Sequence, residues 1–292
     1  MSDLLAEMGR YWKAGKLVPY LGPGIWREEE GVSAPFPIDA ESLSESLARR
    51  VAVPSRVRKN LSAAAQYIES HRHRKTLRKL LLDTFSVEIP RLALHEWLVS
   101  HPHLPLIVDV WYDGGLRALL RSRSDWGEIQ GVSQADAPGS WTRAFDPDGA
   151  EVPPEAAAGW KTVLYKPLGS ATPAGNFLIS DSDYVEVLTE IDIQTPIPPV
   201  VQERRRESHF LFLGCRFSSQ TERTYARQIL KRSSDRHWAI LPEELSRNEE
   251  RFLRELCIER IPFSLPELCE ALTGLSEAGM SVCRKVDEKG SI

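Results

Sequence analysis

The chain has few cysteines, and none of them form the pairs that zinc sites use. The sequence contains 4 cysteines in 292 residues, at Cys215, Cys257, Cys269 and Cys283. Because no C-x-x-C pair occurs among them, we expect no structural metal site. Scattered cysteines without a secretory signal are typical of a reducing cytoplasm, and this is the location we expect.

Other absences exclude further classes of protein. The formal net charge is only −4, so no overall charge favours binding to nucleic acid or to a membrane surface. No apolar run is long enough to cross a bilayer. The sequence also has no internal repeat and no G-x-S-x-G elbow of the serine hydrolases. A small ligand and a protein partner remain as the expected binding partners.

The sequence does contain a series of short apolar runs that are separated by segments of helical periodicity. The runs are residues 17–21, 104–111, 162–165, 209–214, 238–241 and 260–263. Short strands that are apolar on both faces are typical of a parallel sheet with helices on both sides. The last third alternates strand and helix in the manner of a doubly wound sheet. We therefore predict an α/β fold with a Rossmann-like parallel sheet.

The domain organisation follows from changes in this pattern. Residues 1–274 are predicted to form a single domain, which begins with an amphipathic helix over residues 1–16. Leucines at helical spacing predict a helical insertion or small subdomain over about residues 40–100, with Asn60 capping one helix. Glycine and proline are frequent over about residues 122–160, which we interpret as an irregular or hairpin excursion. Residues 275–292 lose the apolar period and are predicted to be a flexible tail.

Residues 17–26, with the sequence LVPYLGPGIW, are the most informative segment. An apolar run that ends in a glycine pair predicts a buried strand that turns sharply into a loop. Glycines at such a turn let backbone N–H groups approach a ligand closely, as a diphosphate requires. A turn without a ligand is the alternative for this segment taken alone.

Four segments in a recognisable order add to this prediction. They are LGPGI at residues 21–25, VDVWYD at 108–113, LYKPLGS at 164–170 and FLGCRFS at 212–218. The segment SDSDYVE at residues 180–186 follows the third. This series resembles the sirtuin-like superfamily, and more closely its divergent bacterial branch of silent-information-regulator-like domains. The resemblance covers roughly residues 15–272.

The resemblance implies a fold, a cofactor and a reaction. Members have a Rossmann-like sheet with a smaller inserted domain, and they cleave the nicotinamide–ribose bond of NAD to deacylate lysine or to hydrolyse NAD. Their first motif is a Gly-Ala-Gly loop on the diphosphate and ribose, and their fourth is a glycine turn near the adenosine half. The implied nucleotide-binding residues here are Gly22, Pro23, Gly24, Ile25, Trp26, Asp113, Lys166, Gly169, Gly214 and Cys215.

The positions that carry catalysis in this family are changed in this chain. The family's asparagine in the second motif, which positions ribose or water, falls on Trp111. Its histidine in the third motif, a general base on a ribose hydroxyl, falls on Leu168. Neither side chain has a basic nitrogen or a titratable group that could do this work. Pro23 also separates the glycines, Trp26 stands where serine is usual, and the zinc-binding cysteines of deacylating sirtuins are missing.

Several candidate residues allow two interpretations. Trp26 and Trp111 either fill the space where nicotinamide would bind or stack on the ring of a different ligand. Lys166 either contacts a phosphate or ends a strand in solvent. Asp113 supports either the fold or the ligand, and Cys215 is either a small buried residue or a reactive thiol.

Charged and histidine residues elsewhere have the same ambiguity. The basic stretch at residues 72–79 and the charge run at 203–207 are either solvated faces or sites for an acidic partner. His95 lies on a predicted helix, where it packs or caps, and the histidines at 101 and 103 precede a strand rather than follow it.

The sequence therefore predicts a sirtuin-like domain that is catalytically inactive and binds NAD, ADP-ribose or a related nucleotide. Such a domain would act as a sensor or as a partner-binding subunit. An NAD glycohydrolase that uses displaced catalytic residues is the first alternative. A structural interaction protein with a closed pocket is the second.

Overall fold

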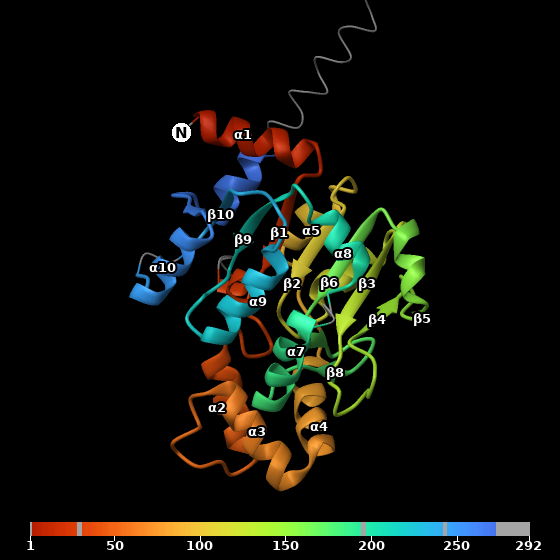
Figure 1. Cartoon of the computed structure of the whole chain (residues 1–292), viewed down its shortest axis with the longest axis vertical. Coiled ribbons are helices and arrows are strands. Elements are labelled where there is room, and N and C mark those ends of the chain that lie inside the picture. The colour runs from red at the N-terminus through yellow and green to blue at the C-terminus, as the bar shows by residue number, and fades with distance from the viewer. Residues whose placement is uncertain (1, 28–30, 194–196, 242–243, 273–292) are drawn as a thin grey trace, which may run out of the picture.

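A mostly parallel sheet forms the centre of the molecule (Figure 1). The structure, a computed structural model, describes residues 2–27, 31–193, 197–241 and 244–272. Within these residues the main sheet has nine strands in the order β11-β10-β9-β1-β2-β6-β3-β4-β5. Pairing is parallel from β11 to β3 and antiparallel from β3 through β4 to β5. The predicted Rossmann-like α/β sheet is confirmed.

The strands of the main sheet are short. Their bounds are β1 (Leu17–Leu21), β2 (Leu106–Asp109), β3 (Trp126–Gly131), β4 (Thr142–Phe145), β5 (Glu151–Val152), β6 (Thr162–Lys166), β9 (His209–Leu213), β10 (His237–Ala239) and β11 (Ile258–Arg260). A separate two-stranded sheet is made by β7 (Gly169–Ser170) and β8 (Asn176–Phe177).

The central strands are buried on both faces, which is why their sequences are continuous apolar runs. In β1, Leu17 and Leu21 join one hydrophobic cluster, whereas Val18 and Tyr20 join a second cluster on the opposite face. We call the side of Leu17 the first face and the side of Tyr20 the second face. Alternation of side chains along each strand fixes this division.

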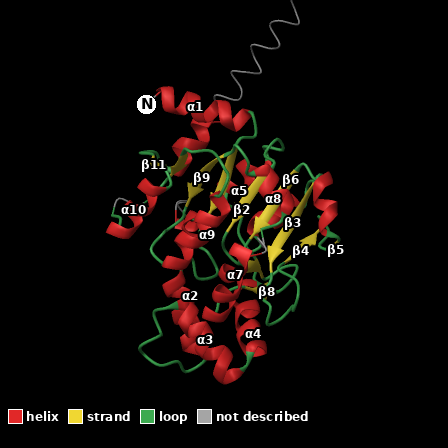
Figure 2. Ribbon diagram, viewed as in Figure 1, coloured by secondary structure: helices red, strands yellow, loops and turns green. Residues whose placement is uncertain are grey.

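Helices cover both faces of the sheet (Figure 2). The first face is covered by residues of α1 (Ser2–Lys13), α5 (Ala93–Val99), α6 (Gly115–Leu120) and a helix over residues 265–272. The same hydrophobic cluster continues into α2 (Ala40–Arg50), α3 (Leu61–Arg72) and α4 (Arg74–Phe85). The second face is covered by α8 (Pro199–Arg204), α9 (Gln220–Leu230), α10 (Arg247–Glu255) and the short helix η2 (Pro154–Gly159), and α7 (Asp181–Ile193) packs beside α9. None of the helices in the described residues is long and apolar enough to cross a membrane.

The region between β1 and β2 contains four helices, α2 to α5. The Asn60 side chain accepts a hydrogen bond from the Ala63 N–H at 3.1 Å, so the predicted cap is confirmed. Figure 1 shows α2, α3 and α4 beyond the end at which the parallel strands stop. These helices therefore face the edge of the sheet where the predicted motifs lie.

The region predicted as an irregular or hairpin excursion, residues 122–160, forms antiparallel strand pairs that are continuous with the main sheet. Its strand β3 pairs in parallel with β6, and β4 and β5 extend the sheet as antiparallel strands. The sequence of β3 differs from the apolar runs of the other buried strands, because it carries two glycines and the buried charged residue Glu128. The predicted tail at residues 275–292 lies outside the described residues.

Candidate functional site

The two predicted glycine turns meet at the point where the strand order reverses. From β1 the chain first builds the β2 side of the sheet, and it returns through β9 to build the other side. Ligands of open α/β sheets bind outside the carboxyl ends of the strands at such a switch point. Gly22 follows β1 and Gly214 follows β9, so both turns lie at this point.

The glycines of these turns allow two backbone segments to approach closely. The N–H of Gly22 donates to the Leu213 carbonyl and that of Gly24 donates to the Gly214 carbonyl, both at 2.8 Å. A Cβ atom on Gly22 or Gly24 would lie 2.6 Å from the Gly214 oxygen, which leaves no space for a side chain. Gly214 itself has a φ of +63°. Both N–H groups thus bond to the neighbouring turn rather than pointing at a ligand, which changes the role that we predicted for this glycine pair.

Trp26 belongs to the core. It lies in the short helix η1 (Pro23–Arg27), where Ile25 is buried as well. The Trp26 side chain is 2% exposed, and its ring contacts Phe36 edge to face at a centroid distance of 5.2 Å. Its Nε1 atom is buried and has no hydrogen-bond partner among the described residues.

Trp111 is part of the same aromatic core. Its Nε1–H donates to the Pro37 carbonyl at 3.0 Å, and its ring contacts Phe85 at 6.0 Å. Phe85 in turn contacts Phe36 at 5.4 Å, which connects the two tryptophans through phenylalanines. Both tryptophans therefore pack between the sheet and the helices α2 to α4, as the space-filling interpretation expects.

Lys166 forms a buried ion pair where we predicted a phosphate contact or a solvated strand end. It is the last residue of β6, and its Nζ atom lies 2.5 Å from Oδ2 of Asp109, the last residue of β2. The two side chains are 1% and 7% exposed. Burial alone would lower the pKa of Lys166, but the charges of Asp109, Asp113 and Glu128 raise it. The amine is therefore charged, and it is committed to Asp109.

A second buried charge pair lies beside the first. Arg117 of α6 donates to Glu128 of β3 at 2.6 Å, and Gln130 donates to the other Glu128 oxygen at 2.6 Å. Sequence reasoning missed this group. The one available signal was Glu128 and Gln130 at alternate positions between apolar residues, which places both side chains on the same face of a strand.

The remaining candidate residues support the backbone. Asp113 Oδ1 accepts the Gly115 N–H at 2.9 Å where α6 begins, which is the structural interpretation of this residue. Leu168 is partly buried and packs on the hydrophobic clusters. Next to it Gly169 has a φ of +80° and pairs with Phe177 in the small sheet.

Cys215 and His95 are both buried. Burial raises the pKa of the Cys215 thiol well above its usual value, and the Sγ atom lies 3.4 Å from the Tyr20 carbonyl oxygen. Cys215 is thus the small buried residue of the two interpretations. His95 packs edge to face on Trp26 at 5.8 Å, and burial lowers its pKa to about 4.

Arg74 anchors the helical region to the sheet domain. Asp183 begins α7 by accepting the N–H groups of Ile179 and Ser180 at 2.9 and 3.0 Å. The same carboxylate accepts from Arg74 of α4 at 2.8 Å, and Arg74 also pairs with Asp136 at 2.9 Å. The Arg74 side chain is 11% exposed, so this member of the basic stretch at residues 72–79 serves the interior and not a solvated face.

Comparison with known proteins agrees with this arrangement. The sequence model of a family described as a SIR2-like domain matches residues 105–261, which is more than half of the 292-residue chain. The chain belongs to the SIR2-like domain family. A search of the curated proteins found no match. The matched residues of this SIR2-like domain include Asp109, Trp111, Lys166 and Gly214, and the glycine pair of the first turn precedes them.

This SIR2-like domain lacks polar side chains at two positions where the resemblance implies them. At the positions that the resemblance assigns to the ribose and nicotinamide, the chain has Trp111 and Leu168, whose side chains pack in hydrophobic clusters. No group of three or more metal-binding side chains occurs within the described ranges.

Proposed function

We propose that this SIR2-like domain binds the ADP-ribose portion of an NAD-related nucleotide and does not cleave the nicotinamide–ribose bond. The proposal rests on the residues that stand at two positions, where the chemistry of the family needs an asparagine and a histidine. Trp111 is buried with its single N–H bonded to Pro37, and Leu168 has no titratable group. Neither can orient water or accept a proton.

The position of the turns supports binding. The carboxyl ends of β1 and β9 form the switch point of the sheet, where open α/β sheets take their ligands. A partly exposed guanidinium follows each turn: Arg27 at the end of η1, which pairs with Asp39, and Arg216 after Cys215, whose Nε and Nη2 donate to Glu249. A phosphate would have to share or displace these carboxylates. Arginine suits phosphate groups because its planar fork donates two hydrogen bonds at once. A domain of this kind would report nucleotide levels to a protein partner.

A structural scaffold is the second candidate. One observation favours it: the Gly22 N–H donates to Leu213 at the end of β9 and the Gly24 N–H donates to Gly214 in the turn that follows, so neither cradles a phosphate in this conformation. A scaffold of this type would use the SIR2-like fold as a rigid surface for a partner and would bind no nucleotide.

Two measurements on the full chain test these candidates. Incubation with NAD, followed by detection of free nicotinamide, is expected to show no release above the rate without protein. Turnover at rates near 1 s⁻¹ or above, about the lower end for ordinary enzymes, would overturn the proposal in favour of an NAD glycohydrolase. Thermal unfolding with NAD or ADP-ribose then tests binding. A ligand at 100 times its Kd adds about 2.7 kcal/mol, which corresponds to a Tm increase of about 5–10 °C.

A matched pair of variants locates the site. Arg27→Gln removes a cation beside the first turn, and its surface pair with Asp39 contributes little to stability. Arg143→Gln removes a comparable surface pair between Arg143 of β4 and Glu151 of β5, at the far edge of the sheet. We expect the ADP-ribose shift to shrink in Arg27→Gln and to persist in Arg143→Gln. If millimolar ADP-ribose does not raise the Tm of the unmodified chain, the nucleotide-binding proposal is refuted and the structural scaffold is the function that is left.

A further inference from the structure

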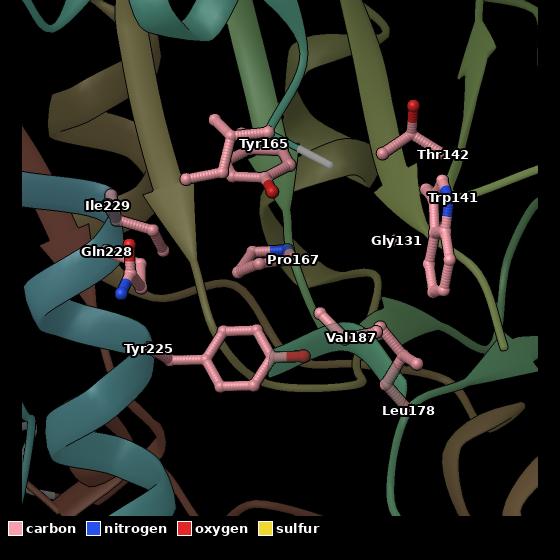
Figure 3. Close-up of a pocket in the computed structure, with 11 residues that line it drawn as sticks. Gly131, Trp141, Thr142, Tyr165, Pro167, Leu178, Val187, Tyr225, Gln228 and Ile229 are labelled. Atoms are coloured by element: carbon pink, nitrogen blue, oxygen red, sulfur yellow. The ribbon is translucent and has the colours of Figure 1, made fainter. Parts of the chain in front are cut away.

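A cleft on the second face of the sheet is too small to be a second ligand site. It lies between the ends of β3 and β6 and the helices α7 and α9, where the Tyr225 hydroxyl is directed between Pro167 and Val187 (Figure 3). This hydroxyl has no hydrogen-bond partner among the described residues. The free space of about 20 Å³ accepts about one water molecule. The cleft therefore holds water at most.

The surface charge of the chain, in contrast, is unevenly distributed. Residues 40–85, which form α2, α3, α4 and the loops between them, contain ten lysines and arginines against four aspartates and glutamates. This is a net charge of +6 within a chain whose formal net charge is −4. Figure 1 shows that these helices extend beyond the end of the sheet. A positive charge that is concentrated in one region favours a polyanionic partner, which the charge of the whole chain conceals.

One side of α4 carries exposed cations. Lys75, Arg78 and Lys79 lie three or four positions apart and are exposed, whereas the leucines on the opposite side of the helix are buried. Arg72, at the end of α3, is exposed just before them. We call Arg72, Lys75, Arg78 and Lys79 the basic stripe. Nε of Arg78 donates to the Gly175 carbonyl at 2.6 Å, which holds this guanidinium in place.

The basic stripe has more cations than nearby acids. Arg72 and Lys75 form no side-chain ion pair or hydrogen bond with the described residues. Lys79 pairs with Asp83 at 3.1 Å, but the same carboxylate also pairs with Arg50 at 3.3 Å. Lys75 lies in the first turn of α4, which has no acidic residue and where the helix dipole disfavours a cation. The stripe therefore carries more positive charge than the fold uses.

The positive surface continues from the basic stripe to the end of α2. Arg50 donates to the Leu80 carbonyl at 3.1 Å, which places the last turn of α2 against α4. The loop after α2 adds Arg56 and Arg58, which are exposed and have no ion-pair partner among the described residues. Cations from α2, α4 and this loop thus belong to one region of the surface.

Phosphate groups match this surface better than an acidic protein does. Protein interfaces gain most of their affinity from apolar and aromatic anchors at their centre, but residues 40–85 expose no large hydrophobic or aromatic side chain. Contacts to a phosphate backbone need only cations and hydrogen-bond donors. Single strands also use exposed aromatic rings for base stacking, so a duplex is favoured here.

We propose that the basic stripe binds the phosphate backbone of a nucleic-acid duplex without reading its sequence. Lys75 and Lys79 are one helical turn apart, about 6 Å along α4, so α4 can contact successive phosphates along one strand. The inference does not require that the turns after β1 and β9 bind a nucleotide.

Fluorescence anisotropy of the full chain with labelled DNA duplexes of about 20 base pairs tests this proposal. Four phosphate contacts should make binding about 150-fold weaker at 200 mM salt than at 50 mM salt. Two duplexes of unrelated sequence should bind alike, because no base is contacted. Failure to bind at 50 mM salt would overturn the proposal. Displacement of the duplex by an equal charge of poly-glutamate would also overturn it and would assign the surface to an acidic protein.

Two double variants locate the contact. In Arg72→Gln with Lys75→Gln we expect duplex affinity at 50 mM salt to fall at least about tenfold and the salt dependence to halve. Arg121→Gln with Arg254→Gln is the matched control, because these exposed arginines lie outside residues 40–85 and also have no ion-pair partner among the described residues. An unchanged salt dependence in the first variant would refute the stripe as the contact.

Unfolding temperatures complete the test. Both double variants should keep the Tm of the unmodified chain, since the substituted side chains are exposed and unpaired. A Tm several degrees lower in Arg72→Gln with Lys75→Gln would show that these cations serve the fold instead. The ADP-ribose shift should be the same in both variants, which separates this test from that of the proposed function.

Discussion

The buried pair of Lys166 and Asp109 yields the sharpest prediction. Lys166→Met keeps the length of the side chain and removes its charge. The change leaves the carboxylates of Asp109, Asp113 and Glu128 in one buried region with Arg117 as their remaining partner. With side chains 1% and 7% exposed, water does not replace the lost ammonium. Removing one partner of a buried pair costs about 3–5 kcal/mol, a large fraction of the 5–15 kcal/mol that is typical of domains.

The partner substitution is expected to cost less. In Asp109→Asn the ammonium of Lys166 still has the attraction of Asp113 and Glu128, and the asparagine can still accept the Trp111 N–H, which lies 3.0 Å from Oδ1 of Asp109. The double variant Asp109→Leu with Lys166→Met removes both charges together. We expect it to be more stable than Lys166→Met alone, with a coupling energy of about 1–3 kcal/mol.

Urea unfolding followed by tryptophan fluorescence measures these differences, since the chain has 8 tryptophans. Lys161→Met is the matched control, because Lys161 is 74% exposed and pairs with Asp125 at 3.5 Å. We expect it to change stability by less than about 0.5 kcal/mol. If Lys166→Met were as stable as this control, the buried ion pair would be refuted, and Lys166 would again be a candidate phosphate ligand.

Two further predictions concern the turns and the buried histidine. In Gly214→Ala the alanine would have to keep a φ of +63°, and its Cβ atom would overlap the amide of Ile25. We expect the free energy of unfolding in urea to fall by about 2–4 kcal/mol. Gly139→Ala, with a φ of +81° but open space, should cost only about 1 kcal/mol, and Gly159→Ala should be nearly neutral; equal losses would contradict the close approach of the turns. Burial lowers the pKa of His95 from 6.5 to about 4, so the unfolded chain binds a proton that the folded chain excludes. Stability should therefore fall by about 3 kcal/mol between pH 6.5 and pH 4, and a His95→Leu variant with the same pH dependence would refute this.

Sequence patterns predicted the central part of the fold because that part obeys local rules. The strand predicted over residues 17–21 matches β1, and the one over 209–214 matches β9 to within one residue. Both strands are buried on both faces, and each is followed directly by a glycine. Strand β3 escaped prediction because a charged residue such as Glu128 is unfavourable in a strand buried on both faces. The charge at that position is compensated by Arg117 of α6, and Gln130 donates to the other carboxylate oxygen.

The sequence predicted which segments carry the motifs, but not the contacts that their residues make. In the structure the four motifs lie at the ends of β1, β2, β6 and β9, which are parallel neighbours in the sheet. The bonding of Gly24 to Gly214 depends on a tertiary contact between segments far apart in sequence, which no local pattern reports. The partner of Lys166 was hidden for the same reason, because Asp109 is 57 positions away.

The contact between the two glycine turns also sets the order in which the chain can fold during synthesis. Tyr20 and Cys215, which meet beside these turns, are 195 positions apart. When β1 leaves the ribosome, β9 has not yet been made, and β2 is the first neighbour that β1 can pair with. Contacts between distant segments close late and slow folding. The edge of the sheet that we propose for nucleotide binding is therefore completed only after more than two thirds of the chain has emerged.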